Sequence, residues 1–218
     1  MDTGKFLEIV DILERDYDSW DAPAKRFEDG YERTPYTILC STLLSFRSRD
    51  EQTLASAKRL FSLAKDPEKM VTFDVEEIRE KIYPIGLHHS KARSILSVSI
   101  ELLERFGGEV PRDYDSLVSI RGIGPKTANI VLENAFGEDV VAVDTHLHRI
   151  CNLWGYIDTS NPAESQEILM RKVPIERRKG LNRLLVSFGQ TICRPSRPLC
   201  KECPVSHLCP IDAIEDDG

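Results

Sequence analysis

The segment Arg121-Gly122-Ile123-Gly124-Pro125-Lys126-Thr127-Ala128 joins two helix-patterned stretches of the chain and decides the fold. Glycine tolerates positive φ, so Gly122 and Gly124 permit a tight turn, and Ile123 can fill the space between the two helices. Backbone N–H groups at the start of the second helix can hold a phosphate oxygen. The pattern predicts a helix–hairpin–helix motif over about residues 117–136, which contacts a nucleic-acid backbone rather than its bases. A helical hairpin without a ligand is the alternative, because G-x-G turns are common.

The rest of the chain shows the 3.6-residue period of amphipathic helices almost throughout, and strand patterns are almost absent. The first such helix is marked by Phe6, Ile9, Val10 and Leu13. Capping residues mark further helix starts at Thr34, Asp50, Asp66, Asp74, Ser90 and Asn161. Glycines mark helix ends at Gly107 and Gly137. The predicted fold class is therefore all-α, with no flexible linker between parts of the chain.

Four cysteines near the C-terminal end follow the spacing C-x6-C-x2-C-x5-C. They are Cys193, Cys200, Cys203 and Cys209. Short spacings and interleaved prolines let four thiolates converge on one metal centre, for which zinc and iron–sulfur are the candidates. Structural zinc sites usually pair two short C-x2-4-C units, and only one is present here, so we favour a [4Fe–4S] cluster. Buried or disulfide-linked cysteines are the alternative.

Composition bears on the compartment and on the partner. No charged and then apolar leader opens the chain, and no apolar run is long enough to span a bilayer, so we expect an intracellular protein that does not enter a membrane. Cys40 and Cys151 lie in apolar helical patterns, where a small buried side chain is expected. The net charge of −7 does not exclude nucleic acid, because a binding surface needs only a local basic stripe.

Two residues near the hairpin carry side chains that could take part in a reaction. Lys126 lies in the first turn of the second helix, where the helix dipole disfavours an ammonium and so favours a nucleophilic amine. A phosphate contact is the alternative role for this lysine. Asp144 directly follows the apolar run Val140–Val143 and precedes another helix. It is suited to act as a helix N-cap, and also to assist Lys126 as a carboxylate.

Together these motifs resemble the endonuclease III family over almost the whole chain. The resemblance is carried by Leu43-Leu44-Ser45 with Asp50, Ile85-Gly86-Leu87 with Ser90-Lys91-Ala92, Gly107–Pro111, Gly122–Asn129, Val143–His146 and the four cysteines. It implies a DNA glycosylase with a DNA-binding cleft between two helical domains. A six-helix domain would span residues 28–137, and an iron–sulfur cluster domain would combine residues 1–27 with 138–218.

The resemblance also implies roles for individual residues. Lys126 would attack C1′ of a damaged nucleotide and form a Schiff base, after which β-elimination breaks the strand 3′ to the lesion. Asp144 would stabilise the positive charge that develops at C1′. Arg47 and Leu87 match the positions that fill the space left by the extruded nucleotide. Arg194, Arg197 and Lys201 in the cysteine loop can offset the anionic cluster and reach DNA phosphates.

This chain departs from the family pattern at two places. It reads Phe46-Arg47-Ser48-Arg49-Asp50 where the family commonly has Ala-Gln-x-x-Asp, and His88-His89 where an aromatic residue and an asparagine are usual. Arg47 can contact the orphaned base, or it can bind phosphate or solvent instead. The histidine pair is expected to face solvent on a loop. These departures leave the lesion spectrum and the preferred opposite base open.

The leading interpretation is a monomeric, bifunctional glycosylase and abasic-site lyase that removes oxidised pyrimidines of the thymine-glycol type. Its partner is double-stranded DNA with damaged or abasic sites. A monofunctional mismatch or adenine glycosylase is the first alternative, although such relatives generally lack a lysine at the position of Lys126. A non-enzymatic iron–sulfur DNA-binding protein is the second, and it leaves Lys126 and Asp144 without a role.

Overall fold

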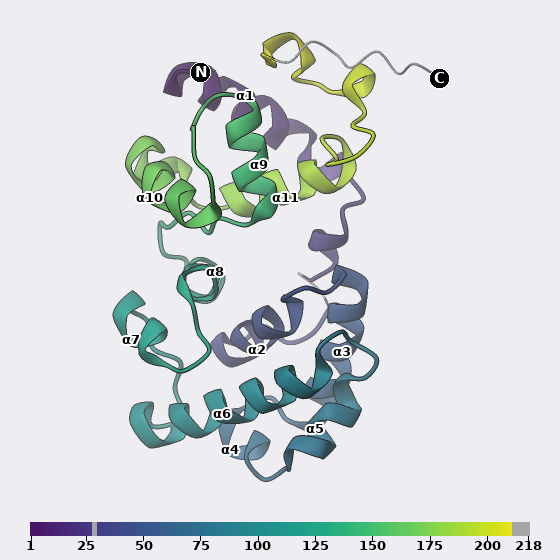
Figure 1. Cartoon of the computed structure of the whole chain (residues 1–218), viewed down its shortest axis with the longest axis vertical. Helices are drawn as coiled ribbons and strands as arrows, with labels where there is room; N and C mark the ends of the chain where they lie inside the picture. The colour runs from purple at the N-terminus through teal and green to yellow at the C-terminus, as the bar shows by residue number, and fades with distance from the viewer. Residues whose placement is uncertain (28–29, 211–218) are drawn as a thin grey trace. The chain divides into compact units, whose positions relative to one another are not determined.

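The computed structural model describes residues 1–27 and 30–210, which form α-helices, short 3-10 helices and no β-strand (Figure 1). The prediction of an all-α fold is confirmed. The chain divides into two compact units, which we call the terminal unit, Met1–Lys25 with Asp139–Gly218, and the central unit, Arg26–Glu138. We propose that they correspond to the domains expected at 28–137 and at 1–27 with 138–218. Within the described residues, no helix has the length and apolar character needed to cross a membrane.

The central unit is built from seven α-helices in its described part. They are α2 (Pro35–Ser45), α3 (Asp50–Leu63), α4 (Pro67–Met70), α5 (Val75–Ile82), α6 (His88–Phe106), α7 (Tyr114–Ser119) and α8 (Pro125–Phe136). Six were expected. Helix α4, whose start at Asp66 was predicted, is a single turn: the Asp66 side chain accepts a hydrogen bond from the Lys69 N–H, and Pro67 takes the first helical position.

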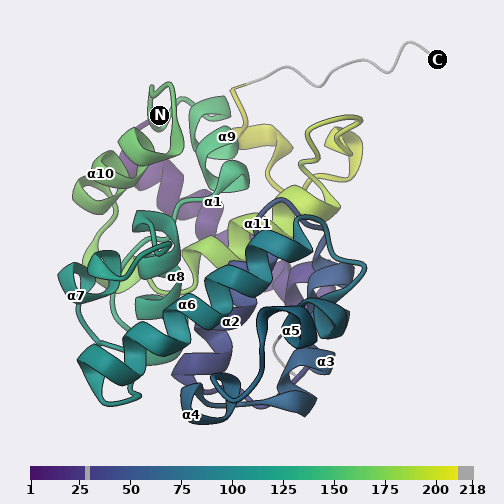
Figure 2. The same ribbon diagram turned by 60° about the horizontal axis from the view of Figure 1, so that its bottom comes forward.

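Helix α2 occupies the centre of this unit and contacts α3, α6 and α8 (Figure 2). Residues on all of its faces are buried, as expected for a helix that other helices surround. The Tyr36 hydroxyl shares a buried hydrogen bond of 2.6 Å with the Ser99 hydroxyl of α6. Cys40 is also fully buried, and this burial raises the pKa of its thiol to about 12. The prediction that Cys40 is a small core side chain is confirmed.

Most of the predicted helix boundaries are confirmed by capping contacts. Thr34 and Asp74 form capping boxes, and Gly107 and Gly137 end α6 and α8 with left-handed backbone. Two starts were wrong. Arg49 is the N-cap of α3, and Asp50 is its first helical residue. Helix α6 begins at His88, so Ser90 and the histidine pair lie inside its first turn rather than on a loop.

The terminal unit combines the two ends of the chain. Its α-helices are α1 (Thr3–Asp16), α9 (Thr145–Leu153), α10 (Pro162–Lys172) and α11 (Leu181–Thr191). Asn161 caps α10, as predicted. The four apolar residues that predicted α1 are all buried. The Phe6 ring stacks on Tyr156 with centroids 3.8 Å apart, so α1 shares one core with the C-terminal half of the chain. Cys151 is buried in that core, as predicted, and its burial raises the pKa of its thiol to about 12.

Short 3-10 helices lie between and after these helices. They are η1 (Tyr17–Ser19), η2 (Pro23–Phe27), η3 (Ile175–Arg177), η4 (Cys200–Glu202) and η5 (Ser206–Leu208). The last two lie in the cysteine loop, residues 193–209, which follows α11.

Truncation of Leu39 tests the central position of α2. Leu39 is fully buried, so Leu39→Ala should lower the free energy of unfolding by about 2–5 kcal/mol through lost contacts and the cavity that remains. Leu43→Ala removes the same atoms one turn later from a half-buried site and should cost clearly less. Urea unfolding followed by circular dichroism measures both variants. Equal losses would contradict the burial of α2 on all sides.

Candidate nucleic-acid interface

The predicted helix–hairpin–helix is present in the central unit. Helix α7 ends at Ser119, and the Ile123 N–H donates to the Ile120 carbonyl over 3.1 Å to close the turn. Gly122 has a φ of 94°, which a side chain would strain, and Ile123 is only 4% exposed. One expectation was wrong: Gly124 has a φ of −94°, which any residue can adopt. The turn therefore requires glycine at 122 for its backbone but not at 124.

The start of α8 offers free backbone donors. Gly124 is its N-cap and makes no side-chain capping bond, and Pro125 occupies the first position. The N–H groups of Lys126 and Thr127 in the first turn thus have no partner within the helix. A Cβ atom built on Gly122 or Gly124 would meet no atom within 4 Å. The hairpin therefore presents N–H groups beside open space, an arrangement that suits a phosphate oxygen.

Lys126 is exposed at the second position of α8. Within the described part of the chain its ammonium makes no hydrogen bond or ion pair. The amine is therefore available to an external ligand, and no competing carboxylate of the central unit holds it. This availability suits both roles weighed for Lys126, nucleophile and phosphate contact.

Asp144 is the N-cap of α9 in the terminal unit, where its Oδ1 accepts a hydrogen bond of 2.9 Å from the Leu147 N–H. The segment before it is held from two sides. The Asn182 side chain of α11 donates to the Ala142 carbonyl over 2.6 Å, and the Gln166 side chain of α10 accepts from the Val143 N–H over 3.1 Å. The cap and these two contacts hold the Asp144 backbone in place, and one carboxylate oxygen remains outside the capping bond.

Left-handed backbone marks three of the residues predicted to contact DNA. Among the described residues other than glycine, only Arg47, Leu87 and Arg197 have positive φ, at 50°, 59° and 54°. Such a conformation costs about 1–3 kcal/mol and persists only where surrounding contacts impose it. Strain of this kind concentrates at ligand-binding sites. Leu87 is also 49% exposed, which is unusual for a large apolar side chain.

The Arg47 and Leu87 segments lie side by side. A Cβ atom built on Gly86 would lie 3.7 Å from the Arg47 carbonyl oxygen and 3.9 Å from the Ser48 hydroxyl. Lys91, which is only 4% exposed, donates its Nζ to the Ser48 hydroxyl over 2.5 Å, and its backbone N–H donates to the Leu87 carbonyl over 3.0 Å. Lys91 therefore ties the two strained segments together. The role of Lys91 was not predicted from the sequence.

The thiols of the cysteine loop lie near enough to one another in the terminal unit to interact electrostatically. Burial and, less strongly, the nearby thiols of Cys193, Cys209 and Cys200 raise the pKa of Cys203 to about 11, against a hydrogen bond from the Val205 backbone that lowers it. Three of the four cysteines pack against the hydrophobic core. In the described part of the chain, no three His, Cys, Asp or Glu side chains form a group that could hold a metal ion.

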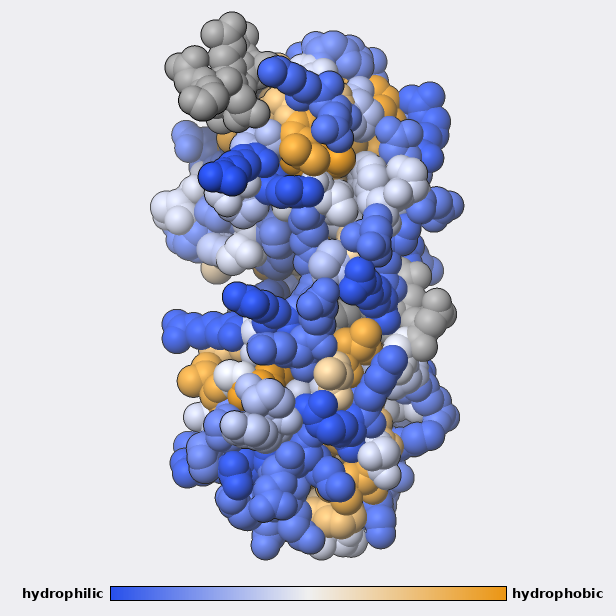
Figure 3. Space-filling view, turned by 90° about the vertical axis from the view of Figure 1, so that its right-hand side faces the viewer, coloured by the Kyte–Doolittle hydropathy of each residue, from blue (hydrophilic) through white to orange (hydrophobic). Residues whose placement is uncertain are grey.

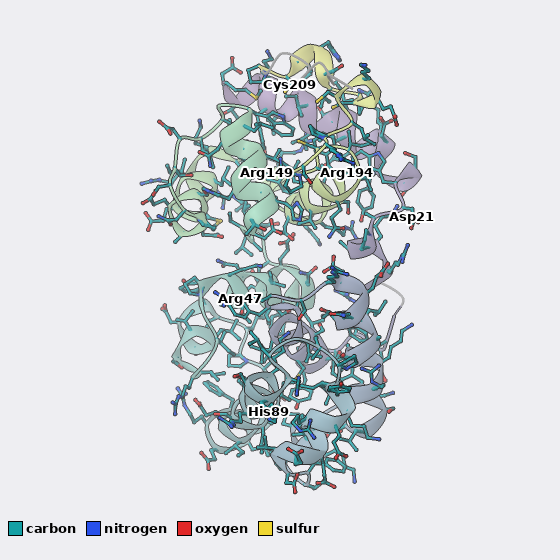
Figure 4. All side chains as sticks on the ribbon, turned by 45° about the vertical axis from the view of Figure 1, so that its right-hand side comes forward. Asp21, Arg47, His89, Arg149, Arg194 and Cys209 are labelled. Carbon is teal, nitrogen blue, oxygen red and sulfur yellow. The ribbon has the colours of Figure 1, made fainter. Side chains whose placement is uncertain are left out.

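Basic residues lie within the cysteine loop and beside it. Arg149 of α9, which is labelled in Figure 4, donates to the Cys193 carbonyl oxygen and, over 3.7 Å, to its sulfur. This contact was not predicted from the sequence, because 44 residues separate the two partners. The Nε of Arg194 donates to the Thr191 carbonyl over 2.9 Å. Arg197 and Lys201 are exposed and make no ion pair with the described residues, so both can reach an anion.

Comparison with known proteins decides the family. The model of the HhH-GPD superfamily base excision DNA repair proteins matches residues 40–175. Endonuclease III of Thermotoga maritima is 39% identical over 186 residues, which cover 85% of this chain and 87% of that protein. The chain belongs to the endonuclease III family.

Solved structures of endonuclease III agree with this chain in fold. A non-covalent endonuclease III–DNA complex has a TM-score of 0.86 at 30% identity, and the match covers 96% of each chain. A trapped covalent endonuclease III–DNA intermediate, described as an estranged-adenine complex, has a TM-score of 0.79 at 32% identity over 94% of this chain and 95% of that one. The family match includes Arg47, Leu87, Lys126 and Asp144, whereas the four cysteines lie beyond it.

Endonuclease III family membership and the hairpin geometry lead to a test with two glycines. Gly124→Val should keep the thermal stability of the wild type, because its φ is permissive and its Cβ meets open space. It should weaken binding to damaged and undamaged duplex alike, since the hairpin contacts backbone and not bases. Gly122→Val should instead lower stability, because its φ is positive.

Calorimetry measures the thermal stability of each variant, and fluorescence anisotropy at two salt concentrations measures its affinity for each duplex. Unchanged affinity of Gly124→Val for both duplexes would exclude the hairpin as the site of phosphate contact.

The buried Lys91 predicts a pH dependence of stability. Burial lowers the pKa of Lys91 to about 8, whereas an unfolded lysine titrates near 10.4. Between these values the unfolded chain binds more protons, so this residue makes the free energy of unfolding rise with pH, on the order of 2 kcal/mol across the window. Lys91→Met should lack that contribution. Denaturant unfolding of both proteins at pH 7, 8.5 and 10 measures it, and a constant difference between them would contradict the prediction.

Proposed function

We propose that this chain removes oxidised pyrimidines of the thymine-glycol type from double-stranded DNA and then cleaves 3′ to the abasic site. Family membership gives the reaction class: the chain is a base excision repair DNA glycosylase with abasic-site lyase activity. The observation that carries the proposal for this chain is the exposed, unpaired Lys126 amine in the first turn of the hairpin helix. The lesion class and the roles of single residues are the proposed part.

Lys126 is the proposed nucleophile. Its amine attacks C1′ of the damaged nucleotide, the bond from C1′ to the base breaks, and the base leaves with the bonding electron pair. Loss of the amine proton and opening of the sugar ring give a Schiff base between Nζ and C1′. That linkage acidifies the C2′ hydrogen, so β-elimination expels the 3′ phosphate. An amine with no ion pair is free to make this attack.

Asp144 is the proposed assisting carboxylate. Its charge stabilises the positive charge that develops at C1′ as the base leaves, and it can accept a proton from the attacking amine. The capping bond and the two side-chain contacts to the preceding segment support this role, because a preorganised charge needs no rearrangement during the reaction. The N-cap function and the chemical function are therefore compatible.

Double-stranded DNA with damaged or abasic sites is the proposed partner, bound by a monomer. The hairpin N–H groups beside Gly122, Ile123 and Gly124 would hold a phosphate, and Arg197 and Lys201 would add contacts on the cysteine loop. Because C1′ is shielded inside the stack, the nucleotide must leave the duplex. Arg47 and Leu87 would enter the vacated space, a role that the strained backbone and the exposure of Leu87 support.

A [4Fe–4S] cluster is the proposed cofactor, held by Cys193, Cys200, Cys203 and Cys209. The donor set is four thiols with no histidine or carboxylate, which suits an iron–sulfur cluster. Thiols that raise one another's pKa need a cationic centre before all of them can ionise, and Arg149 adds positive charge beside Cys193. When bound, the cluster supplies a rigid cross-link for the cysteine loop. The residues that react with DNA lie elsewhere in the chain.

Two substitutions test the assignment of Lys126 and Asp144. Lys126→Gln should abolish borohydride trapping and strand cleavage on a thymine-glycol duplex while DNA binding persists, because the hairpin N–H groups remain. Asp144→Asn keeps a capping side chain, so the fold should survive, but the rate of base release should fall by about 100-fold or more.

Single-turnover kinetics and trapping with borohydride provide the readouts, with thermal unfolding as the control for folding. If both variants release the base at the rate of the wild type, the assignment is wrong, and a protein that only binds DNA becomes the better description.

Metal analysis tests the cofactor. The purified protein should be brown and contain iron and acid-labile sulfide at about four atoms of each per chain. Cys203→Ser should lose the colour and reduce stability and DNA affinity together, because the loop that carries Arg197 and Lys201 loses its cross-link. If the protein contained zinc and no acid-labile sulfide, the four cysteines would form a zinc site, and the assignment of an iron–sulfur cluster would be wrong.

A further inference from the structure

The central unit exposes two aromatic side chains beside its strained segments. Phe46 is 61% exposed and Tyr83 is 58% exposed, and they flank Arg47 and Leu87 on the two adjoining segments 46–48 and 83–87. We call Phe46, Arg47, Tyr83 and Leu87 the aromatic surface. On the face of the molecule in Figure 3, hydrophobic residues form separate patches among hydrophilic ones. Exposed apolar side chains on adjoining segments, such as those of Phe46 and Leu87, commonly mark a binding site.

Phe46 and Arg47 form a pair of planar groups. The Arg47 guanidinium carbon lies 5.3 Å from the centroid of the Phe46 ring. Helix α2 ends at Ser45, and Phe46 is its C-cap with an exposed side chain. The next residue, Arg47, has left-handed backbone. Beyond them, Lys91 and Gly86 contact Ser48 and the Arg47 backbone. The pair is therefore presented to the outside on a backbone that the core holds in position.

We infer that Phe46 is a base-stacking residue that receives the base opposite the lesion when the damaged nucleotide leaves the duplex. This inference rests on the proposed function. A base that loses its partner has lost hydrogen bonds at its edge and part of its stacking. An exposed phenyl ring replaces the stacking, and the guanidinium beside it supplies donors for the edge of the base.

The neighbouring charges favour nucleic acid over a protein as the occupant. Arg47 and Arg49 are both exposed on the segment that carries Phe46, and neither makes an ion pair with the described residues. An exposed aromatic side chain beside unpaired cations suits a strand of bases on an anionic backbone. A surface for a second copy of this chain would instead bring the same cations of two molecules together, and they would repel each other.

Binding to an uncleavable abasic analogue tests the inference without any chemical step. One duplex carries a tetrahydrofuran residue opposite adenine, and a second carries tetrahydrofuran on both strands, so that no opposite base exists. Phe46→Leu keeps an apolar side chain but removes the π-face. It should raise the Kd for the first duplex by about 5- to 100-fold and leave the Kd for the second unchanged. Phe46→Trp should retain or improve binding to the first duplex only.

Ile175→Ala provides the matched control. Ile175 is 57% exposed and belongs to the terminal unit, so it is not part of the aromatic surface, and its loss should change neither Kd. A fluorescent 2-aminopurine opposite the tetrahydrofuran reports stacking directly, and its quenching by the wild type should disappear with Phe46→Leu.

Three outcomes would overturn the inference. They are an equal loss of affinity for both duplexes, no loss for either, and a change in oligomeric state at unchanged affinity. Cleavage of a thymine-glycol duplex by the wild type is measured separately. Absence of that cleavage would remove the proposed function, whereas wild-type cleavage with no difference between the two tetrahydrofuran duplexes would remove only the role of Phe46.

Discussion

The burial of α2 on all sides is the constraint on which the central unit depends. A helix that contacts α3, α6 and α8 together cannot shift without opening three interfaces. Its C-terminal end leads directly into Phe46 and Arg47, and its partner α8 begins at the hairpin with Lys126 in its first turn. Packing around one helix therefore fixes the direction of both segments, and rigid elements of this kind position a site more precisely than free loops do.

In the terminal unit, residues from the N-terminal helix and from the C-terminal half of the chain share one core. Aromatic rings form most of this connection, since Phe6 of α1 stacks on Tyr156 and meets Trp154 edge-on. Charged residues near α10 add to it. Arg177 pairs with Asp11 and Glu14 of α1, and further contacts come from Lys172 and Arg178 to backbone carbonyls. Lys172, Arg177 and Arg178 therefore stabilise the terminal unit through these contacts.

Local signals explain what could be predicted from the sequence. A capping residue before a proline acts within four residues, and so does the turn at Gly122 and Ile123, so their effects do not depend on the rest of the fold. The left-handed backbone of Arg47 and Leu87 has no such signal. Lys91 contacts both segments, and its partner Ser48 lies 43 residues away, while the contact of Arg149 with Cys193 spans 44 residues. Long-range contacts of this kind leave no pattern in a sequence.

The distribution of ion pairs reconciles an acidic chain with a DNA partner. Carboxylates of the described residues pair with one set of cations, namely Arg26, Lys65, Arg79, Arg105, Arg112 and Arg177. No ion pair in that part of the chain involves Lys126, Arg47, Arg197 or Lys201. The net charge of −7 is a sum over the whole chain, and it does not distinguish cations that are paired with acidic neighbours from cations that are unpaired. Phosphates respond to the local field within about one Debye length, so the unpaired cations rather than the total charge decide where DNA can bind.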